Sequence, residues 1–348
     1  MKKEKKVLVV GSAEESGGGV ASVIRLIKKM SVWEEYGCYW LGTQIQAGKW
    51  TKIRYALTAY LRALFIIWRF DIVHFHTVPD FSSLLIQFPV LLLAKIGRKK
   101  VIMHLHVGNQ LYDNTNNRFF KWWMRHSDLI ILLANKFMEI YKSQYADVKT
   151  PADVLYNACE KTESLPYEKH EKTILFAGAF RPNKGGQILI RSFAHIHALY
   201  PEWRLLLLGS GIEENIYKKL ASELGLEEAI EMPGYIGGDA LKDYFKKAGI
   251  YCLCSYKEGF PMVVLEAWAN GVPVITTPVG GLVDVIEEGK NACTFDFGNE
   301  IQLTEQLKTL IQDYSKREFM SDYCKNFSQK LFSLDVISKK TESIYQSL

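Results

Sequence analysis

Short apolar runs recur along the whole chain, and longer segments with helical periodicity lie between them. The runs that have the length of a strand are residues 7–10, 72–75, 101–105, 129–133, 173–177, 204–208, 230–232, 250–254 and 272–276. Strands that alternate with helices are typical of parallel sheets, because two parallel strands need a crossover that a helix usually supplies. The pattern therefore predicts an α/β protein with doubly wound parallel sheets.

A charged stretch at residues 160–172, which contains Pro166, interrupts this alternation once. We interpret it as a linker, because a chain of 348 residues is long enough for two domains. The predicted domains are residues 1–160 and 161–331, both Rossmann-like and facing one another. Residues 332–348 form a further helical pattern, which we expect to pack back on the first domain.

Composition excludes several classes of protein. The six cysteines are scattered without a CxxC pair, so they predict neither a disulfide framework nor a zinc site. Only a strand-length apolar run follows the basic residues 1–6, which is too short for the core of a signal peptide. The longest apolar stretch, residues 84–96, falls short of the roughly 20 residues of a membrane-spanning helix. We therefore predict a cytoplasmic protein.

Two carboxylates bracket a turn in the second half of the chain. Glu258 and Glu266 have Gly259, Phe260 and Pro261 between them, and an apolar, strand-like run precedes Glu258. Proline suits the first turn of a helix, and the free N–H groups of a helix start favour phosphate. In a parallel sheet such a loop lies at the carboxyl ends of the strands, where ligands bind. The motif predicts a site for a diphosphate flanked by hydroxyl groups, and two solvated acids are the alternative.

Two further turns follow predicted strands. Arg181 and Lys184 stand three residues apart after the run 173–177, a spacing that suits a diphosphate clamp, although two exposed cations are the alternative. Gly18 and Gly19 end a glycine run after the first strand, where a backbone can approach an anionic ligand closely. The glycine run is not GxGxxG, which disfavours a nicotinamide cofactor.

The segment 258–281 (EGFPMVVLEAWANGVPVITTPVGG) resembles the signature of the family 4 retaining glycosyltransferases, the glycosyl transferases group 1. The resemblance extends over most of the chain. It implies the GT-B fold, with an acceptor-binding first domain, a nucleotide-sugar-binding second domain and a C-terminal helix that crosses back. It also implies that Glu258 contacts the hydroxyl groups of the donor sugar and that Glu266 contacts those of the ribose.

The same resemblance assigns the other candidate residues. The family places a histidine near the transferred sugar at the end of the strand that precedes His106, and His106 matches better than His74, His76 or His104. Ala179 stands where the family often has arginine, so Arg181 is expected to substitute from a shifted position. The predicted catalytic residues are His106 and Glu258, and the predicted donor-binding residues are Gly18, Gly19, Arg181, Lys184, Gly234, Tyr235, Gly259, Phe260, Pro261 and Glu266.

No Asp-x-Asp pair occurs in the chain, which favours a site without a metal ion, where cations and helix starts neutralise the leaving diphosphate. The prediction is a metal-independent retaining transferase without a cofactor. Its donor is a nucleotide diphosphate-sugar, with a UDP-sugar favoured, and its acceptor is a glycan or lipid-linked glycan of surface polysaccharide biosynthesis, such as capsule or exopolysaccharide. The alternatives are a catalytically silent GT-B subunit that partners another glycosyltransferase and a sugar-nucleotide 2-epimerase.

Residues 50–70 form a basic and aromatic helical pattern. Arg54, Arg62 and Arg69 fall within an arc of about 80° at 100° per residue. Large aromatic residues lie on or beside that arc, and we expect the opposite side to pack on the sheet through Ile53, Leu57, Ala63, Leu64 and Ile67. Residues 118–125 repeat this chemistry. The pattern fits peripheral binding to anionic lipid at the inner face of the cell membrane, and equally a packed core with a solvated rim. No nucleic-acid motif accompanies it.

Overall fold

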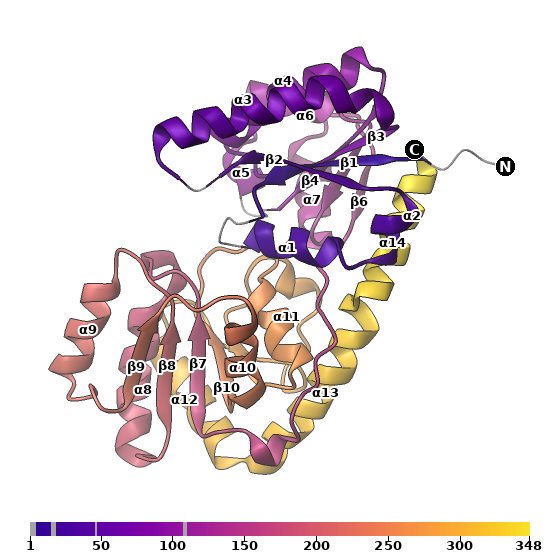
Figure 1. The fold of residues 1–348 in the computed structure, drawn as a ribbon. Helices are drawn as coiled ribbons and strands as arrows, with labels where there is room; N and C mark the ends of the chain where they lie inside the picture. The colour runs from indigo at the N-terminus through magenta and orange to yellow at the C-terminus, as the bar shows by residue number, and fades with distance from the viewer. Residues whose placement is uncertain (1–4, 15–18, 46, 107–109) are drawn as a thin grey trace. The chain divides into compact units, whose positions relative to one another are not determined.

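The computed structural model describes residues 5–14, 19–45, 47–106 and 110–348. The chain divides into two compact units: unit 1 comprises Met1–Ala158 and Phe332–Leu348, and unit 2 comprises Cys159–Leu331. Each unit contains one six-stranded sheet, with helices packed on it (Figure 1). All paired strands of both sheets run parallel, which confirms the predicted α/β class.

The sheet of unit 1 has the order β2-β1-β3-β4-β5-β6. Its strands are β1 (Val7–Ser12), β2 (Tyr39–Gln44), β3 (Ile72–Thr77), β4 (Lys100–Leu105), β5 (Leu129–Leu132) and β6 (Ala152–Val154). Its helices are α1 (Gly19–Ile27), α2 (Ser31–Glu35), α3 (Lys49–Ile66), η1 (Ile67–Arg69), α4 (Phe81–Ile96), α5 (Gln110–Asp113), α6 (Arg118–Arg125), α7 (Asn135–Gln144) and α14 (Leu334–Ser347).

The C-terminal helix α14 packs on the sheet of unit 1. Successive side chains of a strand alternate between faces, so Ile72, His74 and His76 of β3 share one face. On this face Ile337, Ile344 and Tyr345 of α14 join the core that includes Ile72 and its neighbours on the other strands. The opposite face carries Phe75, whose ring meets that of Trp123 from α6 edge to face at 5.1 Å.

The set of buried residues on α3 differs from the predicted one. Ala63 and Ile67 are buried as expected, but Ile53, Leu57 and Leu64 are 40–54% exposed. The buried residues of α3 are the small Ala59 and Ala63, and Tyr60 beside them is half-buried, with its hydroxyl donating to the carbonyl of Ile86 in α4 at 2.8 Å. The expected packing was therefore wrong for Ile53, Leu57 and Leu64. In α6, by contrast, Phe120, Trp123 and Met124 are fully buried, so this segment is mainly core.

The sheet of unit 2 has the order β12-β11-β10-β7-β8-β9. Its strands are β7 (Thr173–Ala177), β8 (Arg204–Leu208), β9 (Ile230–Gly234), β10 (Ile250–Leu253), β11 (Val274–Thr276) and β12 (Cys293–Thr294). Its helices are η2 (Tyr167–Lys169), η3 (Pro182–Lys184), α8 (Gly186–Leu199), α9 (Glu214–Glu223), α10 (Asp239–Lys247), α11 (Met262–Ala269), η4 (Gly280–Asp284) and α12 (Glu300–Gln312). The long helix α13 (Tyr314–Phe332) follows them and ends at the first residue of the C-terminal segment of unit 1.

The core of unit 2 is continuous from the sheet to the helices that cover it. Phe176, Leu205 and Ile250 from three strands pack with Phe193 of α8 and Leu307 of α12, and all five are fully buried. In the described part of the chain, no helix is long and apolar enough to cross a membrane.

Candidate active site

Strands β7 and β10 lie side by side in the middle of the second sheet, where the strand order reverses. The chain leaves β7 toward one edge and returns to β10 on the other side, and ligands of open α/β sheets bind at such a point, outside the carboxyl ends of the strands. The loop after β7 carries Arg181 and Lys184, and the loop after β10 carries Glu258. The topology thus places two of the predicted motifs side by side.

The predicted clamp and the predicted sugar-binding acid form an ion pair. Nζ of Lys184 lies 2.5 Å from Oε1 of Glu258, and the two side chains are only 23% and 14% exposed. The two loops are also joined through their backbones, because the N–H of Tyr256 donates to the carbonyl of Asn183 at 2.8 Å. An ion pair and a backbone hydrogen bond therefore both connect the loop after β7 to the loop after β10.

Two glycines with positive φ allow this close approach. Gly185 has φ +67°, and a Cβ at this position would lie 2.3 Å from the carbonyl oxygen of Cys254. Gly280 has φ +60°, and a Cβ there would lie 2.2 Å from the carbonyl oxygen of Gly259. Because L side chains rarely adopt this conformation, glycine is needed at both positions. The backbone of Gly259 is further fixed by the N–H of Gly281, which donates to its carbonyl at 2.7 Å.

The remaining residues of the glutamate motif lead into α11. Phe260 is 4% exposed, and Pro261 is the N-cap of α11 with φ −70° and ψ 115°. Glu266 lies in the second turn of the helix and is partly buried. The local order is therefore the one predicted: a strand, an acidic loop, a proline at the helix start and an acid within the helix.

Of the other predicted donor residues, Arg181 lies in the same loop as Lys184, and its carbonyl accepts a hydrogen bond from the backbone N–H of Lys184 at 2.9 Å. Arg181 is exposed, and its side chain forms no ion pair or hydrogen bond with another described residue. Gly234 ends the edge strand β9 with φ +90°, and Tyr235 after it is 68% exposed. Gly19 is the exposed first residue of α1, and Gly18 lies outside the described residues.

A buried carboxylate that the sequence analysis missed supports the loop after β7. Glu213 is 4% exposed, and it accepts hydrogen bonds from Nε2 of Gln187 at 2.6 Å and from the hydroxyl of Tyr217 at 3.0 Å. Its backbone N–H donates to the carbonyl of Phe180 at 3.1 Å. No motif in the sequence marks this residue, because its partners come from separate helices.

In unit 1, His106 follows β4 directly and belongs to a group of four buried histidines. Its Nε2 lies 2.7 Å from Nδ1 of His76, and its backbone N–H donates to the carbonyl of Thr77 at 2.9 Å. Nδ1 of His74 lies 2.8 Å from the hydroxyl of Tyr345 in α14. The fourth member, His104, is paired with His76 across the strands.

Burial keeps these imidazoles neutral at pH 7. It lowers the pKa of His106 to about 3. It also lowers the pKa of His74 to about 3, with a smaller contribution from His106, and it holds the pKa values of His76 and His104 well below the usual range. His106 can therefore donate or accept a hydrogen bond as a neutral ring.

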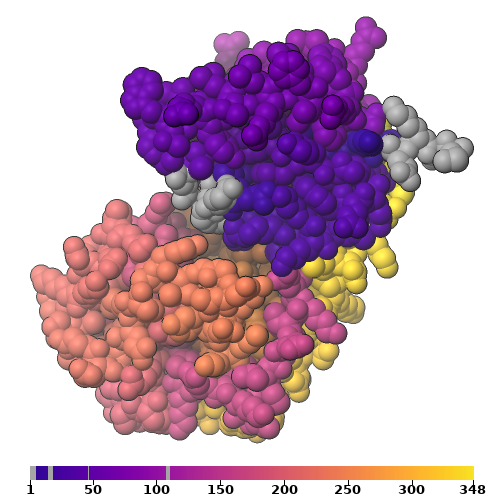
Figure 2. Space-filling model, viewed as in Figure 1, coloured from indigo at the N-terminus to yellow at the C-terminus, as the bar shows by residue number. Residues whose placement is uncertain are grey.

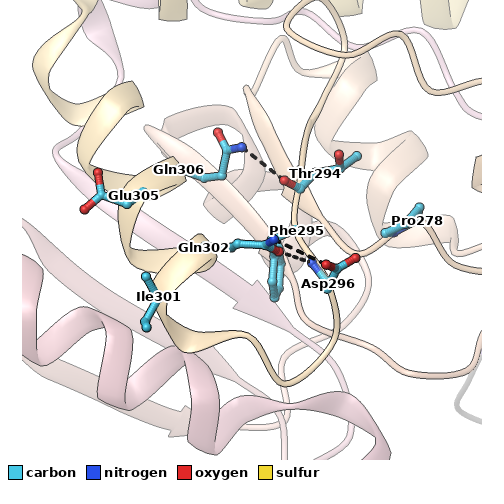
Figure 3. Close-up of a pocket in the computed structure, with 8 residues that line it drawn as sticks. All are labelled: Pro278, Thr294, Phe295, Asp296, Ile301, Gln302, Glu305 and Gln306. Carbon is cyan, nitrogen blue, oxygen red and sulfur yellow. Dashed lines mark hydrogen bonds between the residues drawn. The ribbon is translucent and has the colours of Figure 1, made fainter.

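A surface pocket of about 340 Å³ lies elsewhere in unit 2, next to β12 and the start of α12 (Figure 3). Two of its polar side chains are already paired, since Nε2 of Gln306 donates to the carbonyl of Thr294 at 3.1 Å and Nε2 of Gln302 donates to Asp296 at 3.2 Å. None of the predicted site residues lines it. We therefore place the candidate donor site at β7 and β10.

Comparison with known proteins agrees with this architecture. Residues 158–327 match the model of the family Glycosyl transferases group 1. An uncharacterized glycosyltransferase of Methanocaldococcus jannaschii is 31% identical over 233 residues, which cover 66% of this chain and 62% of the relative. The chain spans between 43% and 62% of the length of the first three curated relatives that it matches.

Solved structures resemble the whole chain. Anabaena HepE, crystallised in complex with UDP-glucose, has a TM-score of 0.77 at 18% identity and covers 99% of this chain and 100% of its own. The sucrose-phosphate synthase of Thermosynechococcus elongatus has a TM-score of 0.80 at 16% identity, with 99% of both chains covered. The fold is thus the GT-B fold of glycosyltransferases, as predicted. Residues 158–327 are therefore similar to the glycosyl transferases group 1, and the relatives that the chain matches include glycosyltransferases.

Proposed function

We propose that the protein is a retaining glycosyltransferase that moves a sugar from a nucleotide diphosphate-sugar, with a UDP-sugar favoured, to a glycan or lipid-linked glycan. The observation that carries the proposal is the Lys184–Glu258 pair at the switch point of the second sheet. HepE, which binds UDP-glucose, supports the donor class. A role in surface polysaccharide biosynthesis is the biological setting that we propose for this reaction.

The ion pair suggests how the donor is bound. A diphosphate that enters the site competes with Glu258 for the ammonium group of Lys184. Phosphate carries more charge than a carboxylate, so Lys184 turns to it, and Glu258 is released to accept hydrogen bonds from the sugar hydroxyls. The N-terminus of α11 adds unpaired N–H groups beside the phosphate. The exposed Arg181 supplies a second cation, and Glu266 binds the ribose hydroxyls.

The proposed chemistry needs no metal ion. The leaving diphosphate gains negative charge as the bond to the sugar breaks, and Lys184, Arg181 and the start of α11 stabilise that charge. In a retaining transfer without a covalent intermediate, the diphosphate itself accepts the proton of the acceptor hydroxyl. In unit 1, which we propose to bind the acceptor, the neutral His106 donates a hydrogen bond to the transferred sugar, and Gly18 and Gly19 bind phosphate or acceptor.

A nucleotide-release assay tests this proposal directly. Wild-type protein is given UDP-, GDP- and ADP-sugars with extracted lipid-linked glycans, and the products are analysed for the anomeric configuration of the new linkage. We expect acceptor-dependent release of one nucleotide diphosphate with retention, and loss of release in Lys184→Ala and Glu258→Ala. Arg191→Ala, which changes an exposed cation on α8, is the matched control. Inversion of configuration, or full activity of both variants, would contradict the proposal.

The two alternatives give different results in this assay and in a thermal-shift measurement with the same donors. A 2-epimerase converts the donor sugar without passing it to an acceptor. A silent subunit neither releases nucleotide nor shows a thermal shift with any donor. The Lys184–Glu258 pair favours an active transferase over a silent subunit, because the two residues are held together with little exposure.

We further propose that unit 1 binds anionic membrane surfaces through α3. Residues 49–70 contain five cations (Lys49, Lys52, Arg54, Arg62 and Arg69) and no acidic residue. Trp50, Leu61, Phe65 and Trp68 are 52–77% exposed in the same segment. Exposed rings beside cations match lipid interfaces with anionic head groups. Figure 2 shows the surface to which α3 and α4 contribute, in violet. Such docking would bring the protein to a lipid-linked acceptor.

A further inference from the structure

Three of the four buried histidines of unit 1, His74, His76 and His104, form a cluster. His74 and His76 alternate on β3, and His104 stands beside His76 on β4, so all three side chains lie on the same sheet face. Their ring centroids are 4.4 to 5.4 Å apart, and one ring nitrogen from each lies within 4.8 Å of the others. Each residue is at most 2% exposed. Three potential ligand atoms therefore converge in a space that bulk water does not reach.

The cluster contains four buried ring nitrogens without a hydrogen-bond partner among the described residues. They are Nε2 of His74, Nε2 of His76, and both nitrogens of His104. Buried polar atoms are almost always paired, so several unpaired atoms at one place point to a bound water or ion. Packing alone does not explain them, because apolar side chains would fill the same face without unpaired nitrogens.

The hydrogen bonds around the cluster have the pattern of a metal site. His74 uses Nδ1 toward the hydroxyl of Tyr345 at 2.8 Å, and His76 uses Nδ1 toward Nε2 of His106 at 2.7 Å. When Nδ1 carries the proton and donates it, Nε2 keeps a lone pair for a cation. Metal-binding histidines are typically oriented in this way by an outer partner. The neutral imidazole is the form that binds metals.

We propose that His74, His76 and His104 bind a divalent transition-metal ion of the zinc class. Imidazole nitrogen suits such ions, and three histidines with a fourth, non-protein ligand are a known zinc set. At Zn–N distances of about 2.0–2.1 Å, tetrahedral nitrogens lie roughly 3.3 Å apart, so small ring rotations within the cluster complete the site. Through its outer partners the ion connects the C-terminal helix to β3 and β4, and it fixes the ring of His106. This proposal is independent of the proposed donor site.

Metal content provides the test. Protein without a metal-affinity tag is produced with zinc supplementation, passed through gel filtration and analysed by mass spectrometry for bound metal. We expect about one equivalent per chain in the wild type and background in His104→Gln. His126→Gln is the matched control, because His126 lies in the same unit and bonds the carbonyl of Trp122 outside the cluster. A wild type without metal, or a His104→Gln protein with as much metal as the wild type, overturns the proposal.

A second measurement remains informative if His104→Gln does not fold. Chelator-treated wild-type protein is titrated with Co²⁺, whose visible absorption bands report nitrogen ligation. Tyr345→Phe keeps all three ligands but removes the hydroxyl that orients His74, so we expect Co²⁺ to bind about 10- to 100-fold more weakly. A wild type without Co²⁺ bands would mean that the cluster holds only water. Unchanged affinity in Tyr345→Phe would remove the outer partner from the proposal.

Discussion

Charge reversal on α3 should release the protein from anionic vesicles. Arg54 and Arg62 are exposed cations on this helix. Each Lys or Arg near an anionic surface contributes about 1 kcal/mol. Arg54→Glu with Arg62→Glu removes two attractions and adds two repulsions, about 4 kcal/mol in total, which corresponds to roughly 1000-fold in the partition coefficient. The effect should diminish as salt rises, because the Debye length falls from about 8 Å at 0.15 M to about 3 Å at 1 M.

The apolar residues of α3 should contribute separately. Leu61 and Phe65 are 62% and 74% exposed, so most of their surface is free to be buried in lipid. Full burial of such side chains is worth about 1.5–3 kcal/mol each. Scaled by these exposed fractions, the two side chains contribute at least about 2 kcal/mol together. Leu61→Ser with Phe65→Ser should therefore lower partitioning by at least about 30-fold, because about 1.4 kcal/mol corresponds to a factor of ten. This loss should be similar at low and high salt.

Flotation with vesicles of phosphatidylcholine, with and without phosphatidylserine, measures both effects. The matched control is Arg191→Glu with Ile212→Ser in unit 2, which changes an exposed cation and a side chain that is 81% exposed. Circular dichroism verifies that each variant is folded. Binding to neutral vesicles as strong as to anionic ones, or unchanged flotation of both α3 variants, would refute the assignment of α3 as a lipid-binding surface.

Three further predictions concern the fold and the chemistry. Gly280→Ala should lower the melting temperature, because the new Cβ would meet the carbonyl of Gly259 and overpacking costs about 1–3 kcal/mol. Gly48→Ala, whose Cβ would have no atom within 4 Å, should leave the melting temperature unchanged. Trp123→Ala should lower the free energy of unfolding of unit 1, measured with denaturant, by about 3–5 kcal/mol, because the ring of Trp123 is fully buried. Trp50 is 77% exposed, so Trp50→Ala should change this free energy by less than about 0.5 kcal/mol. Nucleotide release should be the same with and without added Mg²⁺, and strict dependence on Mg²⁺ would contradict the proposed charge neutralisation by side chains and a helix start.

Apolar runs predicted most of the two sheets, and the strands that they missed share a physical cause. Every predicted strand is present, with ends shifted by at most two residues. The missed strands β2, β6 and β12 lie at sheet edges. An edge strand is covered less completely than a central one and is often short, so it lacks the continuous apolar run of the buried strands. In β2 the pattern is broken by Gly42 and Thr43.

The positions of the candidate site residues along the chain could be predicted from local signals, but the contacts between those residues could not. The sequence placed Lys184 and Glu258 each after a strand, because turn and helix-start signals are local. It could not show that they form an ion pair, because that depends on β7 and β10 being neighbours in the sheet. The histidine cluster could not be predicted for the same reason. His76 and His104 become neighbours only when β3 pairs with β4, and Tyr345, which contacts His74, lies near the C-terminal end of the sequence.

The exchange of partners by Lys184 is the central claim, and calorimetric binding of UDP and of the UDP-sugar that the donor panel selects tests it most directly. Lys184→Met should weaken binding of both ligands, since both carry the diphosphate. Glu258→Gln should bind UDP as tightly as the wild type or more tightly, because the competing carboxylate is gone, and it should lose the additional affinity for the sugar. If both variants bind UDP and the UDP-sugar as the wild type does, the Lys184–Glu258 pair is not the donor site.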